Sequence, residues 1–358
     1  MRVGVPAEVK SDEYRVALTP AGANELARRG HDVWIEHDAG VGASYPDDAY
    51  ERVGAHIGDA EAAWGCDLVL KVKEPQREEY GFLRDEQILF TYLHLAAEPD
   101  VAGALKRAGT TAIAYETVED DRGRLPLLAP MSEVAGRLSV QAGARHLEAH
   151  EGGRGVLLGG VAGVAPGSVV VIGGGIVGIN AAQVAIGMQA HVAILDIDLD
   201  RLRELELVLG GRVTLLHSTQ LAIDEVVQRA DLVVGAVLVP GARAPRLVSR
   251  ELVSQMKPGS VIVDVAVDQG GCVETARPTT HSDPTYVVDD VIHYCVANMP
   301  GAVPVTSTGA LTSATLPHVL ALADHGLEGA LERLPGLVPG INVRDGAIPN
   351  EAVAEALG

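Results

Sequence analysis

The chain has 358 residues, of which 47% are hydrophobic, and its formal net charge is −20. This length predicts two domains, because single hydrophobic cores stop growing at about 250 to 300 residues. The acidic balance argues against nucleic acid or an anionic membrane surface as a partner, although local basic residues can still bind a small anion. The most apolar region, 155–195, is broken by many glycines and Pro166, so we expect no transmembrane helix.

Cysteine usage and the N-terminal residues bear on the compartment. The three cysteines, Cys66, Cys272 and Cys295, are odd in number and lack the spacing of a zinc site or a CxxC motif. Residues 1–10 contain no apolar signal-peptide core. We therefore expect reduced thiols, no metal site and a cytoplasmic protein.

The first 126 residues alternate short apolar runs with helical patterns. A helix is predicted at 20–29, with Thr19 as N-cap, Pro20 at the first helical position and Gly30 just past the end. Alternation of this kind predicts parallel strands joined by crossover helices. The other elements expected here are strands at 2–6, 32–36, 67–73, 88–94 and 110–116, and a helix at 100–108.

Pro126 and Pro130 interrupt the pattern, and a domain junction is predicted there. A long helix at 132–150 is followed by repeated strand and helix patterns, and a helix at about 310–325 precedes an irregular end that returns to the first domain. The strands expected between these helices are 168–172, 191–196, 213–216, 231–237 and 260–265, and the helices are 176–188, 199–209, 220–229 and 249–256.

The most informative motif is a Gly-x-Gly-x-x-Gly loop, Gly173, Gly175 and Gly178, between a β-branched strand and a helix. The first glycine permits the tight turn, the second lets a pyrophosphate approach the backbone, and the third lets the helix pack on the strand. The helix N-terminus offers unpaired N–H groups to the phosphates. In this context the loop predicts a dinucleotide site rather than a structural glycine turn.

An acidic residue, Asp196, closes the next apolar run. A carboxylate there can accept hydrogen bonds from the adenosine ribose, and its charge would repel a 2′-phosphate. The expected cofactor is therefore NAD rather than NADP.

Three basic residues of the first domain follow predicted strands, where open α/β sheets bind ligands. Arg15 lies after the first strand, Lys73 ends the run DLVLKVK, sharing a strand face with Lys71, and His94 ends ILFTYLH. Taken singly, each residue has a plainer interpretation. Arg15 could be a solvated loop charge, Lys73 could pair with Glu74 or another acid, and His94 could be a structural histidine. Together they predict an anion site with a titratable group, the guanidinium binding a carboxylate and the imidazole moving a proton.

In the second domain, Asp268 follows the run SVIVDVAV, on the side where the nicotinamide should lie. The alternative is a turn aspartate before two glycines. Leu238 belongs to an apolar strand end that could flank the nicotinamide ribose, and Asn298 is a polar residue in an otherwise apolar turn.

Long stretches over essentially the whole chain resemble one family. They are Gly4–Lys10, Glu13–Pro20, Leu70–Pro75, Phe90–Leu95, Leu127–Arg137, Asp268–Cys272 and Tyr294–Pro300. The family is that of the L-alanine dehydrogenases, which also contains the NAD-binding subunit of proton-translocating transhydrogenase. One departure is Ser11-Asp-Glu13, where the family usually has an asparagine before the glutamate.

The resemblance implies a role for each matching residue. Arg15 and Lys73 would bind the carboxylate and carbonyl end of the substrate, His94 would be the acid/base residue, and Asp268 would assist at the reacting amine and the nicotinamide. Residues at positions that contact NAD would be Ser132, Asp196, Arg201, Ser218, Leu238 and Asn298.

The expected fold is therefore α/β, with two Rossmann-like domains that have parallel sheets and an active site in the interdomain cleft. Residues 1–126 plus 305–358 would form the substrate and catalytic domain, and 127–304 the NAD-binding domain. The expected activity is reversible, NAD-dependent deamination of L-alanine to pyruvate and ammonium, in a homo-oligomer that the resemblance implies is a hexamer. Three alternatives stay open: a dehydrogenase for another small amino acid, a transhydrogenase subunit that would need a membrane partner, and a non-catalytic NAD-binding protein.

Overall fold

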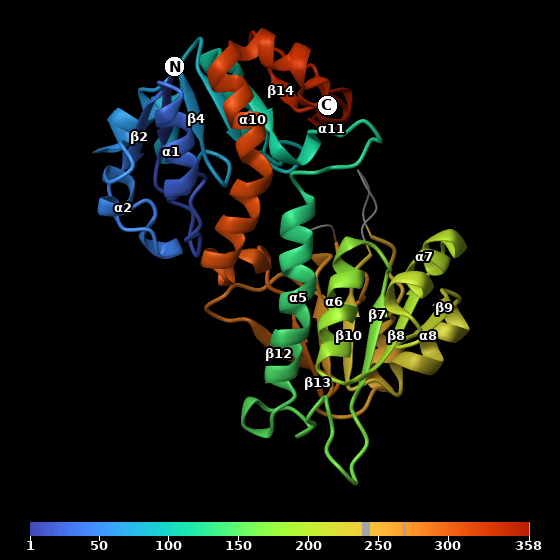
Figure 1. Ribbon diagram of the computed structural model, residues 1–358. Coiled ribbons are helices and arrows are strands. Elements are labelled where there is room, and N and C mark those ends of the chain that lie inside the picture. The colour runs from blue at the N-terminus through green and yellow to red at the C-terminus, as the bar shows by residue number, and fades with distance from the viewer. Residues whose placement is uncertain (238–243, 268–269, 358) are drawn as a thin grey trace. The chain divides into compact units, whose positions relative to one another are not determined.

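The structure is a computed structural model that describes residues 1–237, 244–267 and 270–357. The chain divides into two compact units, Met1–Met131 with Val303–Gly358, and Ser132–Ala302. We call them unit 1 and unit 2 and describe each by itself (Figure 1).

Unit 1 is built on a seven-stranded sheet in the order β14-β6-β5-β4-β1-β2-β3. All neighbours pair in parallel except the edge strand β14, which runs antiparallel to β6. The strands are β1 (Arg2–Val5), β2 (Asp32–Glu36), β3 (His56–Gly58), β4 (Leu68–Leu70), β5 (Ile88–Thr91), β6 (Thr111–Ala114) and β14 (Ile341–Val343). The helices are α1 (Pro20–Arg28), α2 (Asp47–Glu51), α3 (Ala60–Trp64), α4 (Pro99–Ala108), α10 (Pro304–Arg333) and α11 (Glu351–Leu357).

Local sequence explains where several elements of unit 1 begin and how closely they pack. The side chain of Thr19 accepts a hydrogen bond from the Gly22 N–H and so caps α1, as predicted. Gly4 is required in β1 because a Cβ there would lie 1.8 Å from the Ala63 carbonyl of α3. The central strands are fully buried on both faces, as continuous apolar runs in parallel sheets are expected to be.

Unit 2 holds a second seven-stranded sheet, in the order β12-β13-β11-β10-β7-β8-β9. Its edge strand β12 is antiparallel to β13, and the other pairs are parallel. The strands are β7 (Ser168–Ile172), β8 (His191–Asp196), β9 (Thr214–His217), β10 (Leu232–Gly235), β11 (Val261–Asp264), β12 (Thr285–Val288) and β13 (Val291–Tyr294). The helices are α5 (Ala129–His146), α6 (Ile176–Gly187), α7 (Leu199–Leu209), α8 (Gln220–Val227) and α9 (Arg250–Ser254).

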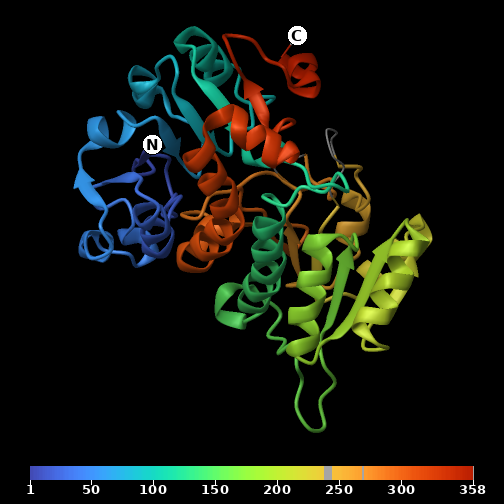
Figure 2. The same ribbon diagram turned by 45° about the horizontal axis from the view of Figure 1, so that its top comes forward.

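Two helices of unit 2, α5 and α6, lie side by side in both ribbon views (Figures 1 and 2). Small residues allow this, since a Cβ on Gly136 of α5 would lie 2.2 Å from the Val177 carbonyl of α6. Arg137 adds a hydrogen bond of 2.9 Å from its Nε to Asn180 Oδ1.

The α/β fold with parallel sheets is confirmed, with corrections near the sheet edges. The sequence did not predict the antiparallel edge strands β12 and β14, and it also missed the parallel strands β3 and β13. The turn before β13 uses Asp289 and Asp290 at φ 51° and 61°, the geometry of a two-residue hairpin turn that usually carries glycine or asparagine. The end after residue 300 is also more regular than expected, because α10 is longer than predicted and β14 and α11 follow it.

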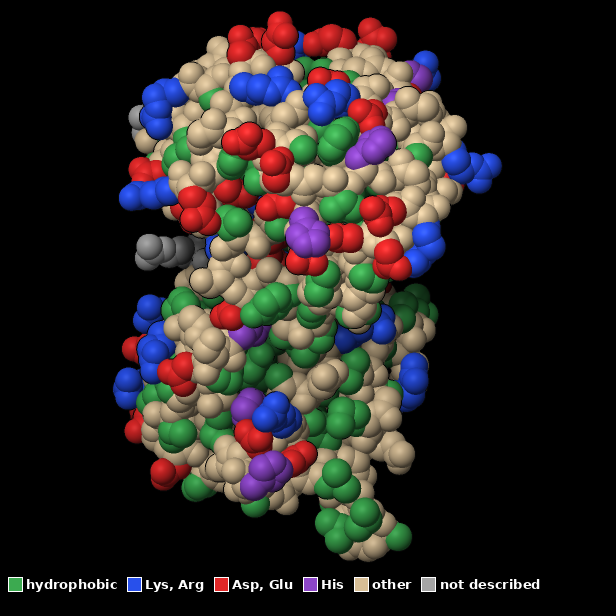
Figure 3. Space-filling model, turned by 90° about the vertical axis from the view of Figure 1, so that its left-hand side faces the viewer, with side chains coloured by type: hydrophobic (Ala, Val, Ile, Leu, Met, Phe, Trp, Pro, Cys, Tyr) green, Lys and Arg blue, Asp and Glu red, His purple; other side chains and the backbone are tan. Residues whose placement is uncertain are grey.

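A loop between α5 and β7 projects from unit 2, and Figure 3 shows hydrophobic side chains on it. Val161 pairs with Val164 in an antiparallel bridge. These two residues and Leu157 are 61%, 62% and 66% exposed. Within the described residues, no helix is long and apolar enough to cross a membrane.

Candidate active site

The three predicted cations of unit 1 follow strands that are neighbours in the sheet. Arg15 comes after β1, Lys73 after β4 and His94 after β5, and these strands pair in parallel in the order β5-β4-β1. Their carboxyl ends therefore lie at one edge of the sheet, the edge at which ligands bind in such folds. The strands are shorter than predicted, so Lys73 and His94 lie in the loops beyond them.

Arg15 is a buried residue, 2% exposed, rather than a solvated loop charge. Its Nε and Nη2 donate to the two carboxylate oxygens of Glu13 at 2.6 and 2.5 Å, and its Nη1 lies 3.1 Å from the Met131 sulfur. Burial opposes the charge of Arg15, but the hydrogen bonds and charge of Glu13 outweigh it and raise the pKa of the guanidinium. The result is a permanently charged group held in one orientation by a bidentate carboxylate.

The departure from the family pattern beside Arg15 has a simple backbone explanation. Asp12 has φ 59°, in the left-handed region. Asparagine and aspartate are the side chains that tolerate this region best. An aspartate can thus stand where the family has asparagine without changing the turn that leads to Arg15.

Lys71 and Lys73 have different surroundings, and they do not share a strand face because β4 ends at Leu70. The Nζ of Lys71 is fully buried and lies 3.2 Å from Glu8 and 2.8 Å from Glu79. Those two carboxylates outweigh the cost of burial and raise the pKa of Lys71. Lys71 is therefore a structural cation.

Lys73 does not pair with its neighbour Glu74, which instead binds the ammonium of Lys10. Among the described residues, the Lys73 ammonium has no hydrogen bond or ion pair. Burial and the charges of Arg15 and Lys10 lower the pKa of Lys73. An unpaired, half-buried ammonium beside a guanidinium is a site that an anion or a polarised carbonyl would stabilise.

Glu8 holds the loop that carries Lys73. Its two carboxylate oxygens accept the N–H groups of Val72 and Lys73 at 2.6 and 3.3 Å. Burial raises the pKa of Glu8, against the opposing charge of Lys71. This residue was missed from the sequence, although it lies inside the family-like stretch Gly4–Lys10.

His94 lies in a turn and is half-exposed, with φ 48°. Its ring stacks parallel to that of Tyr92, at 5.9 Å between centroids. Tyr92 is itself fixed by a 2.6 Å hydrogen bond from its hydroxyl to the Leu127 carbonyl, and it lies within electrostatic reach of Arg15. Tyr92 thus connects the histidine to the arginine.

Together these residues present a guanidinium, an ammonium and an imidazole at the end of one sheet. Such a set can bind a carboxylate, polarise an adjacent oxygen and move a proton. The roles expected for Arg15, Lys73 and His94 stay predictions.

The glycine loop of unit 2 has the geometry that a pyrophosphate needs. Gly173 has φ 103°, and a Cβ on Gly178 would lie 1.8 Å from the Gly173 carbonyl, so both positions exclude other residues. A Cβ on Gly175 would instead project into open space. Gly174 is also constrained, because a Cβ there would come within 2.8 Å of Leu205.

The first turn of α6 is open to a ligand. Side chains of Thr19, Asp198, Thr219 and Ser249 cap α1, α7, α8 and α9, but the N-cap of α6 is Gly175, which has no side chain to cap it. Its first N–H groups are thus left for an anion, as in dinucleotide sites. The glycine loop therefore fits a dinucleotide.

Asp196 ends β8 beside this loop and binds its backbone. Its Oδ2 accepts the Gly174 N–H at 2.6 Å, and its Oδ1 accepts the Asp198 N–H at 2.9 Å. Arg201 reaches the same loop, donating from Nε to the Gly174 carbonyl at 2.7 Å. Ser218 is adjacent, because its N–H donates to the Asp196 carbonyl at 2.9 Å.

The other predicted cofactor residues are less connected or not described. Ser132 is half-buried in the first turns of α5, and Asn298 is half-buried with φ 61°. Asp268 and Leu238 lie outside the described residues. The structure thus brings Asp196, Arg201 and Ser218 together at the glycine loop.

Asp264, at the end of β11, was not singled out from the sequence. It accepts the Ala266 N–H at 3.0 Å and the Cys272 and Val273 N–H groups at 2.9 and 3.1 Å. Burial raises its pKa to about 6, against these three hydrogen bonds. Asp264 therefore ties down both flanks of the segment that carries Asp268.

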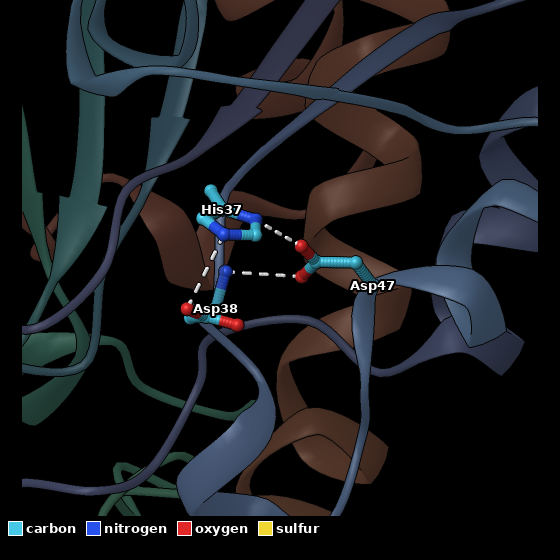
Figure 4. A group of neighbouring side chains, drawn as sticks. All are labelled: His37, Asp38 and Asp47. Atoms are coloured by element: carbon cyan, nitrogen blue, oxygen red, sulfur yellow. Dashed lines mark hydrogen bonds and ion pairs between the residues drawn. The ribbon is translucent and has the colours of Figure 1, made fainter.

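Among the described residues, one group has the composition of a metal site, namely His37, Asp38 and Asp47 (Figure 4). Asp47 binds the His37 ring, and it accepts the Asp38 N–H at 3.0 Å. His37 and Asp38 are exposed. The contacts are those of a loop closed by its own side chains, so they give no support to a metal centre.

Known proteins share both units. Residues 4–135 match the family domain described as "Alanine dehydrogenase/PNT, N-terminal domain", and residues 139–351 match "Alanine dehydrogenase/PNT, C-terminal domain". The chain is 56% identical to an alanine dehydrogenase of Mycobacterium tuberculosis and 54% identical to one of Bacillus subtilis. Both matches cover all of this chain, with 97% and 95% of those proteins.

Solved structures agree with the sequence matches. A structure titled L-alanine dehydrogenase superposes with a TM-score of 0.97 at 54% identity, covering 99% of each chain. A transhydrogenase from Sinorhizobium meliloti superposes with a TM-score of 0.84 at 26% identity, covering 98% of this chain and 100% of that one. On the strength of whole-length identity in both units, this chain belongs to the alanine dehydrogenase/PNT family.

Proposed function

We propose that the protein catalyses the reversible, NAD-dependent oxidative deamination of L-alanine to pyruvate and ammonium. The observation that carries this proposal is the ammonium of Lys73, which has no ion pair among the described residues, beside the oriented guanidinium of Arg15, in a chain with this family membership. Identity above 50% to alanine dehydrogenases over the whole chain favours this activity over that of a transhydrogenase subunit.

Substrate binding follows from the two cations. The alanine carboxylate would bind the guanidinium of Arg15, which Glu13 holds in place from the other side. Lys73 would interact with the second oxygen of the substrate and, after oxidation, with the carbonyl of pyruvate. The guanidinium of Arg15 is preorganised by Glu13, so little reorganisation of this group is needed as charge changes during the reaction.

Proton transfer is assigned to His94. The imidazole, directly or through a bound water, would take one proton from the substrate ammonium and leave a neutral amine. When bound, NAD⁺ accepts the hydride from the substrate Cα. Water then adds to the resulting iminopyruvate, and collapse of the carbinolamine breaks the C–N bond and releases pyruvate and ammonium. Asp268 is proposed to assist at the amine and the nicotinamide.

The cofactor would be held by unit 2. Gly173, Gly175 and Gly178 would admit the pyrophosphate to the N-terminus of α6, and Asp196 would accept hydrogen bonds from the adenosine ribose. Arg201 and Ser218 lie beside Asp196, and Ser132, Leu238 and Asn298 are proposed as further contacts. The carboxylate of Asp196 favours NAD over NADP.

The test is formation of NADH, followed by absorbance, with NAD⁺ and a panel of small L-amino acids. The reverse reaction is run with ammonium and either pyruvate or glyoxylate. We expect L-alanine and pyruvate to be the best substrates. Absence of alanine-dependent NADH formation would overturn the proposal, and a better substrate in the panel would redirect it to another small amino acid.

We also propose that the protein acts in the cytoplasm as a homo-oligomer, which the family resemblance implies is a hexamer. The three cysteines are buried and free, which suits a reducing compartment.

The exposed Leu157, Val161 and Val164 would be covered by a second copy of the chain. Light scattering after gel filtration tests this, with Val161→Asp expected to reduce the measured mass; an unchanged mass would remove the loop from the interface.

A further inference from the structure

Arg15, Lys71 and His94 of unit 1 each lie beside a carboxylate, but the carboxylate beside His94 differs from the other two. Glu13 is paired with the guanidinium of Arg15, and Glu8 is paired with the buried ammonium of Lys71. Glu116, beside His94, has no lysine or arginine partner among the described residues. Its charge is therefore left to act on the histidine.

Glu116 fixes the backbone of the turn that contains His94 by accepting hydrogen bonds from it. Its Oε1 accepts the His94 N–H at 2.6 Å, and its two oxygens accept the Leu93 N–H at 3.2 Å each. His94 has φ 48°, a left-handed conformation that is unfavourable for a non-glycine residue. The carboxylate stabilises this turn, which sets where the imidazole projects.

The same carboxylate faces one nitrogen of the ring. Glu116 Oε1 lies 3.8 Å from His94 Nδ1, and the Glu116 side chain is 14% exposed. This distance allows a charge interaction, although it is longer than a hydrogen bond. A negative charge on the Nδ1 side favours the tautomer with its proton on Nδ1 and leaves Nε2 to accept a proton.

A second contact restrains the plane of the ring. The His94 and Tyr92 rings are parallel within 1°, and the hydroxyl of Tyr92 is tied to the Leu127 carbonyl. The backbone N–H and Nδ1 of His94 therefore face Glu116, and its ring lies parallel to that of Tyr92.

We propose that Glu116 is the positioning residue of His94. It fixes the turn that carries the imidazole, orients Nδ1 and stabilises the positive charge that the ring acquires when Nε2 takes the substrate proton. This inference rests on the proposed function, in which His94 moves that proton.

The decisive variant is Glu116→Gln, which keeps an oxygen that can accept the backbone N–H groups but removes the charge. We expect kcat for alanine oxidation to fall by about 10- to 100-fold, with little change in the KM for alanine, NADH affinity or the melting temperature. The matched control is Asp67→Asn, because Asp67 accepts the Arg2 N–H at 2.9 Å at the opposite, amino-terminal edge of the same sheet. The control should keep wild-type kcat. An unchanged kcat in Glu116→Gln would overturn the proposal.

A double-mutant cycle with His94→Ala separates positioning from a general structural effect. If Glu116 acts through His94, adding Glu116→Gln to His94→Ala should change kcat less than twofold. If the second substitution lowers kcat by as much as it does in the wild type, Glu116 acts independently of His94 and the proposal is wrong.

A second variant covers the case in which Glu116→Gln does not fold. Glu116→Asp keeps the charge but withdraws it by one methylene, and in the same cycle its loss of kcat should also disappear when His94 is absent. The two proposals can fail separately. A wild-type protein without alanine-dependent NADH formation contradicts the proposed function, whereas an active wild type with an unaffected or additive Glu116 variant contradicts only this inference.

Discussion

The two units present their candidate sites in different ways. In unit 1 the chemistry depends on charged side chains, and each is held by a carboxylate distant in sequence or by a neighbour in the same loop. In unit 2 it depends mainly on the backbone, with glycines that remove steric obstacles and a helix whose first N–H groups are uncapped. A site built from backbone groups can therefore be recognised from a short sequence motif. A site built from side chains can be recognised only when it is known which distant residues contact one another.

The largest effect is expected from removing the imidazole of unit 1. His94→Ala should lower kcat by about 10²- to 10⁴-fold, the range typical of a general acid/base. NADH binding, measured by fluorescence titration, should persist because the glycine loop belongs to the other unit. A near-normal kcat would remove His94 from the mechanism. It would also contradict the assignment of acid/base chemistry to unit 1.

The backbone site of unit 2 can be tested with a matched pair of glycine substitutions. Gly178→Ala should lower the free energy of unfolding by about 1 to 3 kcal/mol, because its Cβ would meet the Gly173 carbonyl. Gly175→Ala should leave stability unchanged, since its Cβ meets no protein atom, but should weaken NADH binding by about tenfold or more. Denaturant unfolding and NADH titration give the two readouts. Tight NADH binding by Gly175→Ala would refute the pyrophosphate assignment.

A smaller effect is expected from the one charged side chain assigned to cofactor choice. Asp196→Asn should weaken NADH binding by about tenfold through loss of a charged acceptor, and should bind NADPH better than the wild type does. Arg201 contacts the same loop and would be available to a 2′-phosphate. Titrations with both nucleotides give the ratio of affinities, and an unchanged ratio would show that the ribose lies elsewhere.

The smallest effect concerns the charge state of Lys73. Because burial and the charges of Arg15 and Lys10 lower its pKa, its positive charge is lost at a lower pH than for a free lysine. Pyruvate binding to the enzyme–NADH complex should therefore weaken as the pH rises, and the weakening should begin at a lower pH than a free lysine would give. Pyruvate itself does not titrate above neutral pH, and Lys73→Arg serves as a control that keeps its charge. An equal decline in both proteins would assign the effect to another group.

The sequence predicted much of the fold, and it selected the residues that are proposed for both sites. The glycine loop, its strands and Asp196 were placed because each lies within one continuous motif. The strand-end criterion also selected Arg15, Lys73 and His94. It could have selected Glu116, which ends the predicted strand 110–116 as His94 ends 88–94.

What could not be predicted depends on contacts between distant segments. Nothing in the run DLVLKVK shows that Lys71 binds Glu8 and Glu79 while Lys73 has no ion pair within the part of the chain that the structure describes. The antiparallel edge strand β14 was missed for a related reason. It is three residues long, and its partner β6 is more than 200 residues earlier in the chain.

The buried ion pairs of unit 1 restrict how this site can evolve. Replacing Lys71 alone would leave Glu8 and Glu79 as uncompensated charges in the interior, at a typical cost of about 3 to 5 kcal/mol. Arg15 is likewise joined to the buried Glu13 by an ion pair. Single substitutions at these positions are therefore expected to destabilise the protein, so that selection removes them before they can alter substrate choice. New specificity in this lineage would have to arise through paired changes of acid and base, or through uncharged neighbours such as Met131.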